Sequence, residues 1–192
     1  MGPLILLTFA VGGGFILLII IWIIRLYNAL QRKKLGAETA WSDIDVQLKR
    51  RHDLIPNLVS SVQGYAEHEK STFNAVTQAR AAAVGAQGVA EQAGAENMLT
   101  QSLGRLFAVA ESYPELKANT NFLQLQEELT STENKIGFSR QHFNSQVRSF
   151  NEAIKVFPSN LVAGMFNFST MEFFELDESE AAAVREAPKV QF

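Results

Sequence analysis

The sequence contains no cysteine, which excludes disulfides and thiolate metal sites and is compatible with a reducing compartment. It also lacks the GxSxG, HExxH, P-loop and dinucleotide-binding motifs of common enzymes. Its histidines are His52, His68 and His142, and the run Glu67-His68-Glu69 cannot aim three consecutive helical side chains at one ion. We therefore expect no catalytic residue, no metal and no cofactor, and we predict that the protein is not an enzyme.

Side-chain charge is absent from the first 24 residues, because the first charged side chain is Arg25. The run Leu4–Ile24 is apolar, and as a helix rising ~1.5 Å per residue it would be roughly 30 Å long, the thickness of a bilayer's hydrocarbon core. A cleaved signal peptide is the alternative interpretation. However, no Lys or Arg precedes the run and no small-residue cleavage site follows it. We predict a retained transmembrane anchor over residues 1–25.

Positive charge appears only after the anchor, at Arg25, Arg32, Lys33 and Lys34 and again at Lys49, Arg50 and Arg51. Because positively charged flanks stay in the cytosol, we expect a single-pass protein of the cell (inner) membrane with its N-terminus outside and its C-terminus cytosolic. Basic residues outnumber acidic ones over 25–83, where they can meet anionic lipid, and acidic residues dominate 84–192. No basic face with interleaved aromatics is present, so we expect no nucleic-acid partner.

Three consecutive glycines, Gly12, Gly13 and Gly14, lie inside the apolar run. They have two interpretations: they could let two membrane helices approach closely, or they could reflect the ordinary frequency of glycine in such helices. We keep them as candidate membrane or subunit contacts.

Apolar residues recur every three or four positions from Trp41 to Val76, which predicts one long amphipathic helix. Pro56 interrupts it, since proline removes the hydrogen bond to the carbonyl of His52. Asp53 could cap a new helix there. The apolar register survives Pro56, however, so we favour one helix that continues through a kink. Gly36 weakens its link to the anchor.

A second long helix is indicated by a heptad-like stripe from Phe122 to Phe157, typical of a coiled coil, with one shift near Phe143. Asn121 is its expected N-cap and Pro158 its end. Between the two long helices, a shorter helix is predicted from Met98 to Ala110. The connections are predicted over the Ala-, Gly- and Gln-rich residues 81–95 and over 116–121.

These patterns predict an all-α fold: an N-terminal transmembrane helix, then an elongated antiparallel helical bundle of three long or medium helices plus a short C-terminal helix. We divide the chain into the anchor (1–25), a helical-bundle domain (26–158) and an aromatic, then acidic, C-terminal segment (159–192). That last segment either folds onto one end of the bundle or contacts a membrane or another subunit. The candidate contact residues are Phe166, Phe168, Phe173 and Phe174.

Polar residues follow both long helices close to their apolar stripes. They form a candidate interhelical layer that would fix register, as a buried Asn does in coiled coils. Plain solvent exposure and a ligand site are the alternatives. The residues are Arg50, Arg51, Asp53, Asn57, Glu133, Arg140, Asn144 and Asn151.

Several blocks together resemble the LemA family. They include Tyr27-Asn28, residues 41–51 and 53–59, Gly64-Tyr65-Ala66-Glu67-His68-Glu69, residues 110–119 and Phe157-Pro158-Ser159-Asn160. The resemblance implies a bacterial-type membrane protein with an N-out anchor and a cytosolic antiparallel helical bundle, and it brings no catalytic residues. One departure is Phe143-Asn144, where Tyr-Asn is more usual.

We therefore expect a non-enzymatic, membrane-anchored scaffold or adaptor on the cytosolic membrane face. Its expected partners are the lipid bilayer, further copies of itself in a homo-oligomer and other membrane proteins. The alternatives are a membrane-remodelling protein, and a ligand sensor or enzyme that uses the polar interhelical layer.

Overall fold

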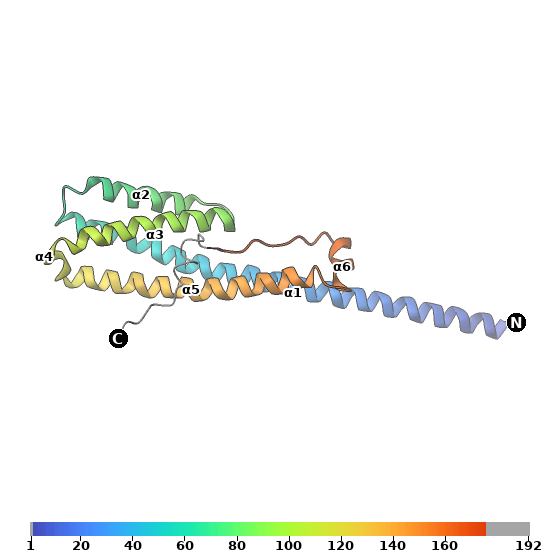
Figure 1. Ribbon diagram of the computed structural model, residues 1–192. Helices are drawn as coiled ribbons and strands as arrows, with labels where there is room; N and C mark the ends of the chain where they lie inside the picture. Colours follow the sequence, from blue (N-terminus) through green and yellow to red (C-terminus); the bar gives the residue numbers. More distant parts are fainter. Residues whose placement is uncertain (1, 176–192) are drawn as a thin grey trace, which may run out of the picture. The chain divides into compact units, whose positions relative to one another are not determined.

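The computed structural model describes residues 2–175, and in that part of the chain every regular element is a helix, as the sequence predicts (Figure 1). The chain divides into two compact units. Unit 1 joins Met1–Ala40 to Asn144–Met171, and unit 2 joins Trp41–Phe143 to the described residues 172–175. The N-terminal apolar helix followed by further packed helices confirms the predicted fold class.

Helix α1 (Gly2–Gln63) runs unbroken through both Gly36 and Pro56. The expected continuation across Pro56 is therefore confirmed, whereas the expected weak point at Gly36 does not end the helix. Gly36 lies close to the side chain of Gln146 on α5, because a Cβ atom added there would be 3.2 Å from its Oε1.

The prediction of one helix up to Val76 is wrong, because α1 ends at Gln63 and α2 (Lys70–Gly85) follows. The chain turns at Gly64, where the backbone amides of Tyr65 and Ala66 both donate to the carbonyl oxygen of Val62 at 3.0 Å. The three-to-four spacing survives this turn because α2 folds back onto the same core. The regular spacing of these apolar residues therefore reflects their burial in one core and does not indicate one continuous helix.

The predicted connection over residues 81–95 is also wrong, because α3 (Val89–Glu111) begins directly after the three residues 86–88. Alanine has the highest helix propensity, and in this stretch it outweighs the scattered glycines. Only Gly88 has the positive φ, 84°, that a turn requires there.

The second predicted connection, residues 116–121, overlaps the end of a short helix, α4 (Pro114–Lys117), and the start of α5 (Thr120–Ala153). Asn119 rather than Asn121 caps α5, because its Oδ1 atom accepts hydrogen bonds from the amides of Asn121 at 2.9 Å and Phe122 at 3.1 Å. At the other end α5 stops at Ala153, before the predicted limit at Pro158.

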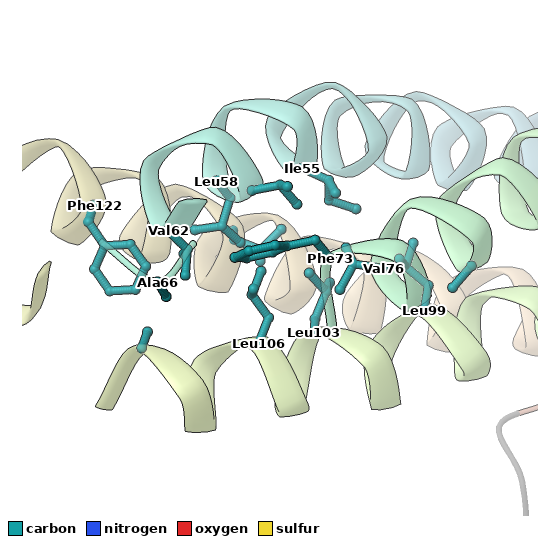
Figure 2. Close-up of a cluster of buried hydrophobic side chains, with 14 of the residues drawn as sticks. Ile55, Leu58, Val62, Ala66, Phe73, Val76, Leu99, Leu103, Leu106 and Phe122 are labelled. Carbon is teal, nitrogen blue, oxygen red and sulfur yellow. The ribbon is translucent and has the colours of Figure 1, made fainter. Parts of the chain in front are cut away.

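The core of unit 2 is formed by side chains from five helices, the long segments α1, α2, α3 and α5 and the short α4, rather than from the three helices expected there. Figure 2 shows side chains from the long segments converging. Phe73 and Val76 come from α2, and Leu129 comes from α5. The largest fully buried members from the other segments are Ile55, Leu58, Leu99, Leu103, Leu106 and Leu116.

In unit 1 the helix α6 (Ser159–Met165) packs on α1, where Val162 and Ala163 bury Leu30. The segment after α6 is held by Asn151, whose Nδ2 donates to the Met171 carbonyl while its Oδ1 accepts from the Met171 amide, both at 2.9 Å. One amide side chain thus satisfies both backbone groups of an irregular residue.

Replacing Leu129 by Ala should lower the free energy of unfolding by about 2–5 kcal/mol, because the side chain is buried and its removal leaves a cavity in the core of unit 2. Thermal unfolding followed by circular dichroism in detergent measures the change. Leu123→Ala is the matched control on the same helix, since Leu123 is exposed and its truncation should change stability little. Equal melting temperatures for the two variants would show that Leu129 does not pack in this core.

Candidate functional site: a buried charged cluster

Three helices of unit 2 bring charged side chains into the interior around Arg51 of α1. Its Nη1 donates to Oε2 of Glu96 on α3 at 2.9 Å. Its Nη2 donates to Thr100 Oγ1 at 2.7 Å and to Glu133 Oε1 on α5 at 2.9 Å. The side chains of Arg51 and Glu96 are only 4% and 3% exposed, whereas that of Glu133 is 44% exposed. One guanidinium therefore ties α1 to both α3 and α5.

The carboxylate of Glu96 is saturated with donors. Besides Arg51 on Oε2, its Oε1 faces His52 Nε2 at 2.7 Å and accepts from Gln92 Nε2 at 3.0 Å. An ionised carboxylate only accepts hydrogen bonds, so this contact requires the His52 tautomer that carries a proton on Nε2. Three donors from α1 and α3 thus replace the water that this buried charge loses on folding.

Helix α2 supplies a hydrogen bond that the backbone of α1 lacks next to this cluster. Pro56 has no amide proton, so the carbonyl of His52 lacks its helical donor. Nε of Arg80 donates to that oxygen at 2.7 Å. A second arginine therefore satisfies the group that proline leaves open, and it does so one residue after Arg51.

A small pocket of about 160 Å³ opens beside this cluster in unit 2. Arg51, Glu96, Thr100 and Glu133 form its polar wall. The other wall consists of residues further along α5 and of the segment after α6, namely Ile136, Gly137, Arg140 and Phe174. The pocket is half open, and it carries two arginines against two glutamates.

The structure separates the eight candidate polar residues. Arg51 and Glu133 lie together in the cluster, and Arg140 lines the pocket beside them. Arg50 is half exposed and faces Glu128 at 3.8 Å, and Asp53 and Asn57 are exposed, so these three lie outside the interhelical cluster. The remaining two are Asn144, which is half-buried, and Asn151, which binds Met171 in unit 1.

The candidate contact residues also differ in environment. Gly12, Gly13 and Gly14 are exposed, and a Cβ atom added to any of them would have no neighbour within 4 Å. Phe174 is buried against Trp41, with ring centroids 5.4 Å apart, and Phe168 lies 5.7 Å from Tyr27. The two others are Phe173, half-buried, and Phe166, half exposed.

Five members of the cluster were not recognised from the sequence: His52, Arg80, Gln92, Glu96 and Thr100. Glu96 lay between the predicted connection, residues 81–95, and the predicted helix that began at Met98, and it was assigned to neither. A signal was present, since the apolar stripe of Leu103 and Leu99 extends backward by one turn to a charged residue. A charge on an apolar helix face needs a buried partner.

The geometry indicates a structural role for the cluster. Both oxygens of Glu96 accept hydrogen bonds from side chains of α1 and α3, so this carboxylate holds the two helices together. Within residues 2–175, no group of three or more His, Asp or Glu side chains is arranged to hold a metal ion.

Replacing Glu96 by Gln should destabilise unit 2 by roughly 3–5 kcal/mol, because it leaves the buried Arg51 guanidinium without its main counter-charge. Glu128→Gln is the matched control, because it removes a half-exposed ion pair worth less than about 1 kcal/mol. Chemical unfolding measured by circular dichroism checks both variants. Two equal and small effects would mean that the cluster adds nothing to stability.

Comparison with known proteins identifies the family. The sequence model of the LemA family matches residues 40–192 of this chain. The chain is 26% identical to the magnetosome protein MamQ of Magnetospirillum gryphiswaldense over 174 residues, 77% of this chain and 64% of that protein. It is 28% identical to protein LemA of Metamycoplasma hominis over 159 residues, which are 82% of this chain and 72% of that protein.

A magnetosome protein MamQ 2 of Paramagnetospirillum magneticum is 24% identical over 78% of this chain and 64% of its own length. The chain thus spans a little under two thirds of the length of these magnetosome relatives. None of these names gives an enzyme activity. Because the matched region contains most of α1 beyond the apolar run and all the later helices, the chain belongs to the LemA family.

Proposed function

We propose that this protein is a non-enzymatic scaffold that is anchored by α1 in the cell (inner) membrane and presents its helical units in the cytosol. The observation that carries the proposal is the exposure of the apolar run. Every large apolar side chain from Phe9 to Ile24 except Ile23 is at least 40% exposed, and they point in all directions around the helix. A helix that is apolar all round needs an apolar solvent, which a bilayer supplies.

The helix meets the length and composition needed to cross a membrane. Trp22 and Tyr27 lie near the end of the apolar run, where amphipathic rings favour the membrane interface. The charges that follow, from Arg25 to Lys34, favour retention of that side in the cytosol.

A scaffold rather than an enzyme is favoured by the way in which the polar interior is used. The buried Glu96 carboxylate and Arg51 guanidinium bind each other and side chains of neighbouring helices, so both groups serve to hold the helices together. The exposed glycines add a surface through which copies can associate within the bilayer.

Replacing Arg25, Arg32, Lys33 and Lys34 by Gln should produce a mixture of orientations, because it removes the positive flank nearest the span. A C-terminal reporter that is active only in the cytosol measures the outcome, and the unsubstituted chain should give full activity. Replacing Glu38, Asp43, Asp45 and Asp53 by Asn or Gln is the control, since acidic residues contribute little to orientation. An inactive reporter on the unsubstituted chain would refute the proposed topology.

Self-association should depend on the glycines of the span. Gly13→Leu should lower the oligomer fraction, because a larger side chain keeps two helix backbones apart. Within one copy the substitution meets no neighbour within 4 Å, so a loss of oligomers reports a contact between copies. Mass measurement in detergent over a range of concentrations detects it.

The matched control is Val11→Leu, an exposed position in the same apolar run that already carries a side chain. A chain ending at Glu175 tests the C-terminal residues while retaining every contact described above. If the intact protein is monomeric at all concentrations, self-association is excluded and the anchoring role alone remains.

A further inference from the structure

Unit 1 exposes a group of large apolar side chains where α5 is followed by α6. Phe157 is 78% exposed, although the transfer of a phenylalanine side chain out of water is favourable in free energy. We call this group the α5–α6 patch. Its members are Val156, Phe157, Leu161, Met165 and Phe166. Nothing in the cluster already described uses any of them.

The position of this patch along α1 follows from the helix register in unit 1. Lys33 Nζ donates to Ser149 Oγ at 2.6 Å, and Gly36 lies against the side chain of Gln146. These two contacts pair α1 and α5 in opposite directions, one residue for one residue. Counted to the end of α5 at Ala153, this pairing reaches the level of Ala29, and Val156 and Phe157 follow in the turn directly beyond it.

The packing agrees with this register. Ile154 packs in the cluster that contains Ile23 and Leu26, and α6 covers Leu30. Figure 1 shows α6 beside α1 at the end of α5 that lies toward the N-terminal part of α1. The patch is thus next to the residues at which the apolar run of α1 ends.

Bilayer dimensions make this level significant. The headgroup region adds roughly 5–8 Å on each side of the hydrocarbon core. Leu30 lies only ~9 Å along the helix beyond Ile24, at ~1.5 Å per residue, and Ile154, which leads into the patch, packs in the same cluster as Leu30, Ile23 and Leu26. The exposed apolar side chains of the patch therefore lie within reach of the interface.

Charge and polarity around the patch fit the same environment. Arg25 and Lys155 are both exposed beside it and can meet anionic headgroups. Tyr27 contacts Phe166, with ring centroids 4.7 Å apart and the rings tilted by 56°, and tyrosine is a residue that favours the membrane interface. A hollow of about 320 Å³ next to this pair is lined by Gln31 and Lys34, so polar groups follow the apolar ones along α1.

We propose that the α5–α6 patch inserts into the cytosolic interface of the bilayer and forms a second membrane contact beside the transmembrane span. The inference rests on the proposed anchoring of α1. In this arrangement unit 1 contacts the lipid surface directly and is not connected to the membrane through the span alone. The occupant of the patch is lipid, not a second protein.

Spin labels on single cysteines test this in the full chain, which has no native cysteine to remove. Three leucines of equal exposure make a matched series: Leu17 in the apolar run (57%), Leu161 in the patch (57%) and Leu35 further along α1 (60%). Phe157→Cys supplies a second patch position. Each variant is placed in nanodiscs that hold one copy, and the accessibility of the label to oxygen and to a water-soluble nickel chelate is measured.

We expect the ratio of oxygen to nickel accessibility to fall in the order Leu17, patch, Leu35, with the patch labels severalfold above Leu35. Patch labels that match Leu35 while Leu17 stays in lipid would overturn the inference and leave the anchor intact. Patch labels protected only in discs holding two copies would overturn it in favour of a contact between copies. A water-accessible label at Leu17 would refute the proposed anchoring itself.

Discussion

The buried carboxylate of Glu96 is the constraint on which the rest of unit 2 depends. A carboxylate this deep in a helical core is unfavourable unless donors replace the water that it loses, and here Arg51, His52 and Gln92 all do so. Those donors come from fixed positions on α1 and α3, and the Arg51 guanidinium also reaches Glu133 on α5. The hydrogen bonds of the cluster therefore tie fixed positions of α1 to fixed positions of α3 and α5.

Proline in the middle of α1 is accommodated by the same region. The missing amide of Pro56 leaves the His52 carbonyl without its helical donor, and Arg80 from α2 supplies one. The backbone of His52 is thus tied to α2 while its side chain is tied to α3. Two neighbouring residues of α1, Arg51 and His52, consequently connect it to all three of the other long segments in unit 2. This explains how α1 can stay helical through residue 56 without a compensating residue nearby in its own sequence.

Much of the fold could be predicted because apolar periodicity reports which side of a helix is buried. It identified the apolar run, the continuity of α1 through Pro56 and most of α5. It could not show that the chain reverses after Gln63, since Phe73 and Val76 return to the same core and keep the same spacing. It also missed the start of α3, where alanines offset glycines. Of the site, Arg51 and Glu133 were identified as polar residues near apolar stripes. Glu96 was missed because its partners come from helices that only the folded chain brings together.

Helix α1 changes the character of its exposed surface along its length, and the burial of its side chains shows where this transition lies. Up to Ile24 large apolar residues are exposed on all sides, whereas at Leu30 the first fully buried side chain appears and a one-sided stripe begins. Around this change, Ile23, Leu26 and Tyr27 pack against α6 and the segment that follows it. That segment has irregular backbone, and Asn151 satisfies both polar groups of Met171 in it. The transition therefore needs more than a change of sequence pattern in α1. It requires the end of α5, α6 and the residues after it to cover one side of the helix directly where its apolar surface gives way to charge.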